Sequence, residues 1–280
     1  MTSRKAAQGI ALSVLTSASL LGSLALAPTA SAATSWESGC TRASYLNANT
    51  WGYRVCDAPD IDQGRAGAPG DGGSYCAPAA SLNALFWLDK HGYPNLLTGD
   101  YDPTSSADPD YSEVTAKMIR MGERMDTDSP GGTTTDDLID GVRSLVEEKG
   151  YGSRISVLSA SFEDDDKDAA SISRTLVALT NGGRGMLVAR LGRYDDDGDR
   201  VSGHFVTVVG AEGGKNTTAY RPTVILHNPA GGGDIRTQSE TTSDSHTLGA
   251  NDGNGPAITR YGSPAVTVRL EGVVAIMPNP

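Results

Sequence analysis

Cysteine and histidine are scarce in this 280-residue chain, which contains three cysteines and four histidines. Few positions can therefore carry thiol or metal chemistry. The acidic run at 195–199 does not match a calcium-binding EF-hand loop, because Arg193 stands where that loop needs an acidic residue. The three aspartates at 164–166 are more typical of a solvated turn than of a metal site. We expect neither a metal nor an organic cofactor.

Long apolar runs are absent after residue 32, so no later segment is expected to span a bilayer. Before it, basic residues at 4–5 precede an apolar stretch at 10–27 and an A-x-A cleavage site at 30–32. This pattern predicts a secretory signal peptide over residues 1–32 and a mature chain that begins at Ala33. A retained membrane anchor is the alternative, which the serines within the stretch disfavour. We expect a secreted, extracellular protein with no membrane contact after signal removal.

Basic residues are outnumbered, with 23 Lys and Arg against 34 Asp and Glu and a formal net charge of −11. An acidic surface argues against nucleic acids and anionic membranes as partners. It is usual for a soluble secreted protein and identifies no substrate. We expect a monomer.

About 248 residues remain after the signal peptide, which suits one large domain or two small lobes. No internal repeat is present. We expect an N-terminal extension and loop at 33–70, followed by the main domain at 71–280.

Helical and β patterns separate along the chain. Apolar residues at helical spacing dominate the first half, whereas short β-rich runs dominate the second. Helices are expected at 76–91, 111–125, 135–149 and 168–181. Strands are expected at 186–191, 204–211, 223–228, 265–270 and 273–277, with a long surface loop at 229–262. This order predicts an α+β fold, with helices first and an antiparallel sheet in the C-terminal half.

Cys76 is expected at the N-terminus of the first helix. Pro78 is compatible with a helix only in its first turn, where the missing N–H costs nothing. The unpaired N–H groups and the positive end of the helix dipole should favour a thiolate at Cys76. The same N–H groups can stabilise an oxyanion.

The other two cysteines are 16 positions apart and are expected to pair. A disulfide between Cys40 and Cys56 would contribute roughly 3 kcal/mol by the chain-entropy estimate. Cys76 would then be an unpaired thiol, which is unusual in a secreted protein and suggests a functional role. A Cys56–Cys76 bond is the alternative, and it would remove the candidate nucleophile.

A nucleophilic thiol needs a base, normally histidine. His91 is at the far end of the same helix as Cys76, and His246 is in the expected loop. His204, at the start of a strand, and His227 remain, and His204 is the better candidate.

Asn228 is the expected partner of His204. His227 and Asn228 are neighbours on a strand and face opposite ways, so only one can look toward the site. An amide oxygen at Asn228 can accept the ring N–H of His204 and fix the tautomer. Cys76, His204 and Asn228 then form a Cys-His-Asn arrangement.

These residues lie in segments that resemble a known family. "YCAPAASLNALFWL", "GHFVTVVG" and "ILHNPAG" are similar, in this order, to the conserved blocks of papain-like cysteine peptidases of the C39-like branch. The resemblance covers about residues 57–280. It implies a papain-like fold, peptide or protein substrates, and hydrolysis without a cofactor.

The resemblance also implies a glutamine upstream of the cysteine that donates to the oxyanion. Gln63 is the candidate, 13 residues before Cys76. Two departures are visible: Ala77 stands where the family has glycine, and Asn228 replaces the aspartate of this branch, although papain uses asparagine. Two alternatives stay open, a peptidoglycan cross-link amidase or transferase and a catalytically inactive, peptidase-like binding module.

Overall fold

The computed structural model describes residues 34–35, 41–55, 57–99, 109–163, 167–230, 244–259, 261 and 266–279. The expected signal peptide lies outside these residues. Both cysteines of the expected disulfide, Cys40 and Cys56, lie outside them too, as do the aspartates at 164–166.

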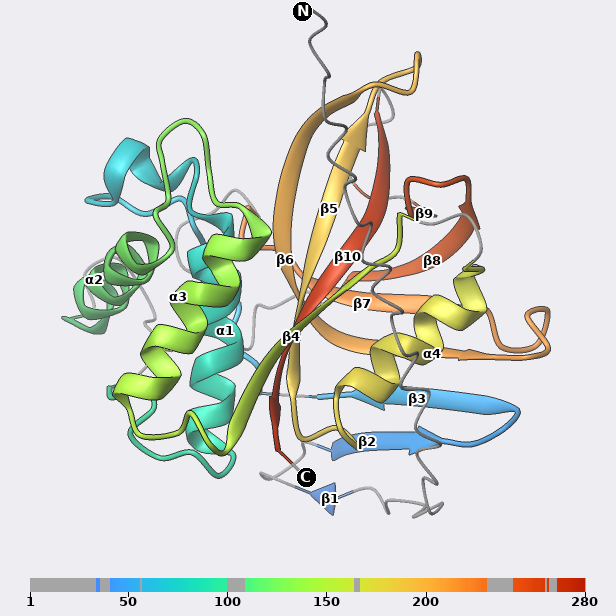
Figure 1. The fold of residues 1–280 in the computed structure, drawn as a ribbon, viewed down its shortest axis with the longest axis horizontal. Coiled ribbons are helices and arrows are strands. Elements are labelled where there is room, and N and C mark those ends of the chain that lie inside the picture. Colours follow the sequence, from blue (N-terminus) through green and yellow to red (C-terminus); the bar gives the residue numbers. More distant parts are fainter. Residues whose placement is uncertain are drawn as a thin grey trace, which may run out of the picture.

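The described part of the chain is α+β, as predicted (Figure 1). Its helices are α1 (Cys76–Lys90), α2 (Pro109–Arg124), α3 (Thr135–Glu148) and α4 (Ala169–Leu179), with a 3-10 turn at Pro69–Gly72. Its strands are β1 (Thr34–Ser35), β2 (Thr41–Leu46), β3 (Thr50–Arg54), β4 (Ile155–Ser161), β5 (Met186–Tyr194), β6 (Arg200–Gly214), β7 (Thr223–His227), β8 (Asp244–Asn251), β9 (Pro256–Ile258) and β10 (Thr267–Pro278). The four expected helices are therefore confirmed to within about two residues at each end.

The strands form one antiparallel sheet that closes on itself. The order β6-β5-β10-β9-β8-β7 is completed by pairing of β7 with β6, which makes a ring of six strands. Strands β3, β2 and β1 continue outward from β6, and β4 pairs with β10. Figure 1 shows α1, α2 and α3 together on one side of the sheet and α4 apart from them, near β2 and β3.

Helix α1 is the central element of the core. Every residue from Ala77 to Leu88 is buried, so the helix has no solvent face. It contacts β5 and β6 as well as α2 and α3. A helix that is apolar all round is expected in this position, because neighbours cover it on every side.

Helix α3 shows the local signals that made it predictable. The hydroxyl of Thr134 accepts a hydrogen bond from the N–H of Asp137 at 3.2 Å, which is an N-cap contact. Its buried side, which includes Leu138 and Val142, faces the core, and Gly150 follows its end with a positive φ.

The strands at both ends of the chain depart from expectation. Residues 41–54 form β2 and β3, and β3 pairs with β6. The expected surface loop is wrong over 244–258, where β8 and β9 form instead. The two last expected strands are one strand, β10, with a bulge between Leu270 and Gly272. Strand β4 was not expected.

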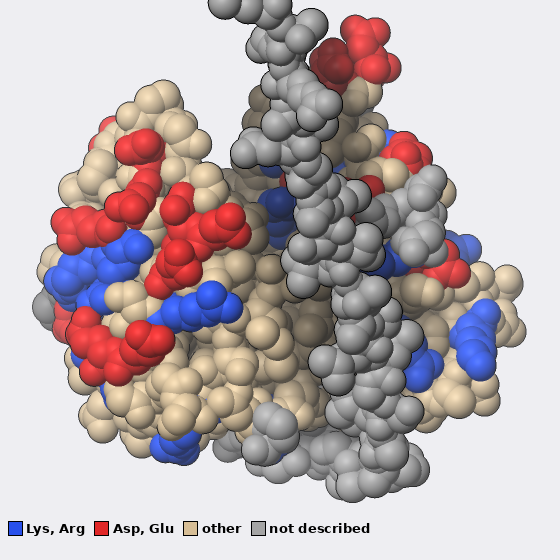
Figure 2. Space-filling view, in the orientation of Figure 1, with Lys and Arg blue, Asp and Glu red and all other residues tan. Residues whose placement is uncertain are grey.

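Figure 2 shows acidic side chains gathered over the helical part of the molecule, with basic side chains between them. Lys117 pairs with Glu113 and Arg124 with Glu148 in this region. Among the described residues, no helix has the length and apolar character that crossing a membrane requires.

Candidate active site

Cys76 is the first residue of α1, as its sequence context predicts. Pro78 occupies the third helical position, where its missing N–H breaks no helical hydrogen bond. The thiol is free, so the Cys56–Cys76 disulfide is not formed. The side chain is partly buried against the core.

His204 and Asn228 are brought together from two neighbouring strands. His204 lies near the start of β6, and Asn228 directly follows β7. The distance from His204 Nε2 to Asn228 Oδ1 is 2.8 Å. The N–H of Ala230 donates to the same Oδ1 at 3.0 Å, which identifies this atom as the amide oxygen. Because an amide oxygen only accepts, Nε2 of His204 carries a proton, and in the neutral ring Nδ1 is left as the basic nitrogen.

The sulfur of Cys76 lies against the strand that carries His204. The backbone N–H groups of Phe205, Ala77 and Cys76 lie close enough to this sulfur to lower the pKa of the thiol. Phe205 directly follows His204 in β6, so the start of α1 and the start of β6 meet at the thiol.

The resting thiol differs from the expectation of a stabilised thiolate. Burial raises the pKa of Cys76, and the three backbone N–H groups offset this only in part. Burial also lowers the pKa of His204; the charge of Arg193 adds to this, and the hydrogen bond to Asn228 opposes it. These shifts favour a neutral thiol at Cys76 and a neutral imidazole at His204. Burial was not visible in the sequence, and it outweighs the helix N-terminus here.

Gln63 lies beside the loop that leads into Cys76. Its Nε2 donates to the carbonyls of Gly72 and Gly73, each at 3.1 Å, so both amide hydrogens are used. Its Oε1 is buried and accepts no hydrogen bond from the described residues. A Cβ at Gly72, whose φ is 78°, would lie 1.6 Å from the Gln63 carbonyl oxygen. In this arrangement Gln63 holds the loop before Cys76 rather than offering a free donor.

Asn83 and Thr207 connect α1 to β6 by hydrogen bonds, and the sequence did not point to either residue. Asn83 accepts from the N–H of Ile61 at 2.9 Å and donates to Thr207 Oγ1 at 3.0 Å. The Thr207 hydroxyl in turn donates to the carbonyl of Ala80 at 3.1 Å. The sequence did contain a signal for them, because Asn83 is a polar residue in an otherwise apolar helix and Thr207 is one in an apolar strand.

Removing the hydrogen bonds of Asn83 should destabilise the fold. In Asn83→Ala the buried N–H of Ile61 loses its acceptor, so we expect the free energy of unfolding to fall by about 1–3 kcal/mol, as for other unsatisfied buried groups. Ser81→Ala in the same helix is the matched control, because the Ser81 hydroxyl is fully buried, has no hydrogen-bond partner in the described part of the chain, and its loss should cost nothing. Urea unfolding of both variants measures the difference. Equal unfolding midpoints for Asn83→Ala and Ser81→Ala would contradict the role given to Asn83.

The other histidines lie elsewhere. His227 Nδ1 is 3.2 Å from the carbonyl of Pro59, so this buried ring helps to hold the loop before α1. His246 is buried in β8, with Nδ1 2.9 Å from the carbonyl of Thr259. His91 stacks on Trp87 at the end of α1.

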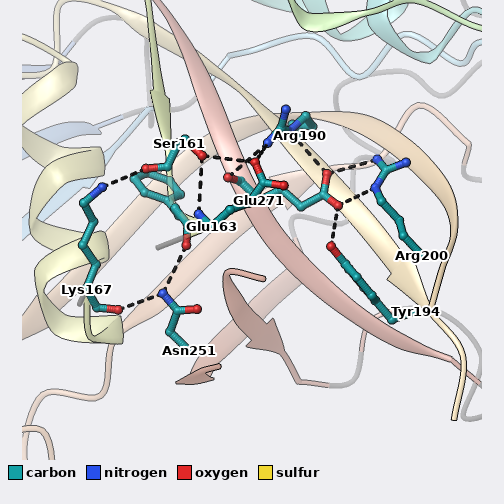
Figure 3. A network of polar contacts seen from close by, with 9 residues as sticks. Ser161, Glu163, Lys167, Arg190, Tyr194, Arg200, Asn251 and Glu271 are labelled. Carbon is teal, nitrogen blue, oxygen red and sulfur yellow. Dashed lines mark hydrogen bonds and ion pairs between the residues drawn. The ribbon is translucent and has the colours of Figure 1, made fainter. Parts of the chain in front are cut away.

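A buried carboxylate joins strands β10, β5 and β6 (Figure 3). Glu271, only 1% exposed, occupies the β10 bulge and binds two arginines. Its oxygens accept from Arg200 Nε at 2.5 Å and Nη2 at 3.0 Å, and lie 3.3 Å from Arg190 Nε. Tyr194 Oη donates to it at 2.9 Å, and burial together with this carboxylate raises the pKa of Tyr194 to about 12. The network links β10, β5 and β6.

Protein-family models and curated proteins were compared with the chain, and neither comparison found a match. Within the described ranges, no group of three or more His, Cys, Asp or Glu side chains is placed to hold a metal ion.

Proposed function

We propose that this chain is a secreted thiol hydrolase of the papain-like, C39-like type that cleaves peptide bonds. The observation that carries the proposal is the hydrogen bond between His204 and Asn228, on strands that neighbour the helix whose first residue is the free thiol of Cys76. The thiol of Cys76 lies at a helix N-terminus, near the backbone N–H of Phe205, the residue after His204, and His204 is oriented by Asn228.

The neutral resting pair points to general-base activation. The Nδ1 atom of His204 takes the proton from Cys76 Sγ as the sulfur attacks the substrate carbonyl carbon. The resulting imidazolium then gives this proton to the departing amine as the C–N bond breaks, which leaves a thioester on Cys76. Water, deprotonated by the same nitrogen, attacks the thioester and releases the acid and the free thiol.

The oxyanion would be stabilised by the start of α1. The backbone N–H of Cys76 is one donor, and Ala77 is the next N–H of the same unpaired turn. Gln63 becomes a donor in this scheme only if substrate binding frees one hydrogen from Gly72 or Gly73.

An inactive, peptidase-like binding module is the second candidate. Two observations favour it: the raised pKa of Cys76 and the use of both Gln63 amide hydrogens within the loop.

A digestion experiment separates the two candidates. The full chain is incubated with a mixture of peptides from a digested proteome, and new termini are detected by mass spectrometry. Hydrolysis that disappears after thiol alkylation supports the enzyme. Peptides retained by the protein without any new termini support the binding module.

Asn228→Asp tests the role of the third residue. A carboxylate beside Nε2 favours the imidazolium, so the pKa of His204 should rise from its present lowered position. The acid limb of kcat/KM should therefore move to higher pH, by about one pH unit, the usual size of an ion-pair shift. In Asn228→Ala the acceptor is lost, and kcat should fall about ten- to a hundredfold, by analogy with other orienting groups. An unchanged pH profile in Asn228→Asp would remove Asn228 from the mechanism.

Export and the disulfide belong to the same proposal. A signal peptide over 1–32 and a bond between Cys40 and Cys56 are consistent with Cys76 being the free thiol. Peptide mapping of the secreted chain without reduction tests both claims, since it identifies the N-terminal residue of the mature chain and the cysteines that are bonded to each other.

A further inference from the structure

Arg193 lies next to the candidate base by strand register. In the β5–β6 ladder Leu191 is directly opposite His204, and Arg193 is opposite Ser202. Residues two apart on a strand share a face, so Arg193 is the diagonal neighbour of His204 on the same face of the sheet. The charge of Arg193 acts on the His204 ring, as their proximity requires.

This arginine differs from its neighbours in having no acidic partner within the ranges that the structure describes. Arg190 pairs with Glu163 and Glu271, Arg200 pairs with Glu271, and Arg269 pairs with Asp252. Arg193 is partly buried, and its side chain forms no ion pair or hydrogen bond with any of the described residues. A cation beside the candidate histidine, in a chain with excess acid, therefore has no ionic partner among the described residues.

We propose that Arg193 binds a carboxylate of the substrate next to the scissile bond. This inference rests on the proposed function and specifies the substrate class, an acidic peptide. A guanidinium binds a carboxylate with two parallel hydrogen bonds, which gives both attraction and orientation. The shared chemistry is a carboxylate, supplied either by an Asp or Glu side chain or by the C-terminus of a peptide.

The proposal also explains how a cation is tolerated beside a general base. With the site empty, Arg193 disfavours the imidazolium of His204. A bound carboxylate would neutralise that charge and ease formation of the imidazolium during attack by Cys76. Substrate binding would thereby improve the base at the moment it is needed.

Alkylation of Cys76 by two small reagents tests this without knowledge of the natural substrate. Iodoacetate and iodoacetamide both form a C–S bond with the thiolate and release iodide, and they differ in that only iodoacetate carries a carboxylate. The rate constants at Cys76 in the full chain are measured by mass spectrometry, and their ratio is compared with that of N-acetylcysteine. We expect a ratio that favours iodoacetate relative to the free thiol and that falls as salt is added.

Variants then assign the preference to one side chain. Arg193→Met should lower the iodoacetate-to-iodoacetamide ratio roughly three- to tenfold, the scale of one charge interaction near a surface. Arg193→Lys keeps the charge and should retain most of the preference. Lys215→Met is the matched control, because it removes one exposed cation just beyond the far end of β6 and should leave the ratio unchanged.

The outcomes separate this inference from the proposed function. If Cys76 reacts readily with iodoacetamide and Arg193→Met leaves the ratio unchanged, the carboxylate site is wrong and the hydrolase stands. If Cys76 reacts with neither reagent, the proposed function itself fails.

Peptide substrates identify the source of the carboxylate. An end-blocked peptide cleaved faster with Glu than with Gln beside the scissile bond indicates a side chain, whereas faster cleavage of a free acid than of its amide indicates a C-terminus. Whichever advantage is seen should be lost in Arg193→Met. The absence of both advantages contradicts the proposal.

Discussion

Replacing Cys76 by alanine is expected to lower kcat/KM for peptide hydrolysis at least about a thousandfold, the usual consequence of losing a nucleophile. His204→Ala should cost a similar factor, because the buried thiol, whose pKa is raised, cannot attack efficiently without a base. The double variant should be no slower than either single variant, since the two groups act as a unit. Initial rates on the best peptide from the digestion experiment provide the measurement.

Folding controls make this result interpretable. Cys76 is only partly buried, so alanine at this position should leave the thermal midpoint close to that of the parent chain. Cys76→Ser keeps a side chain of similar volume with a weaker nucleophile. Any hydrolysis by this variant should be slower than that of the parent chain. A Cys76→Ala chain that is folded and still cleaves peptides at the parental rate would end the thiol mechanism.

The helices could be predicted well because their ends carry local signals. Pro78 limits where α1 begins, and Thr134 and Gly150 mark the two ends of α3. These signals act within one helical turn and need no knowledge of the tertiary fold.

The missing strands depend on partners far away in the chain. Strand β3 is stable because it pairs with β6, about 160 positions later, and Trp51 within it donates to Ser173 of α4 at 2.9 Å. Strand β8 pairs with β7 and buries His246 and Leu248. Short strands with mixed composition have weak local signals, since their stability comes from the sheet they join.

The candidate site was predictable in its residue types and not in its electrostatics. The order of Cys76, His204 and Asn228 and their positions at element ends predicted one shared site, and the structure places His204 Nε2 2.8 Å from Asn228 Oδ1. The raised pKa of Cys76 and the engagement of Gln63 depend on burial and on a glycine loop conformation. Neither can be derived from spacing in the sequence.

Glu271→Gln is expected to be a strongly destabilising change despite its conservative size. The carboxylate is 1% exposed and faces two arginines, so a neutral amide would leave Arg200 without an acidic partner among the described residues and Arg190 with Glu163 alone. Breaking a fully buried ion pair costs about 3–5 kcal/mol, and we expect about 2–4 kcal/mol here because Arg190 and Arg200 are partly exposed, at 26% and 45%. Glu163→Gln removes an exposed partner of Arg190 and should cost at most about 1 kcal/mol.

The pH dependence of this effect has a definite sign. Burial alone would raise the pKa of Glu271, but hydrogen bonds from Arg200 and Tyr194 and the charges of Arg200 and Arg190 outweigh it and lower the pKa. The stabilisation is therefore complete above the ordinary glutamate pKa of about 4.3 and is lost as pH falls through the lower folded-state value. Urea unfolding at neutral pH and near pH 3 should show the gap between parent and Glu271→Gln narrowing in acid. A gap independent of pH would mean that Glu271 stabilises the bulge by its shape, which Gly192 accommodates, and not by its charge.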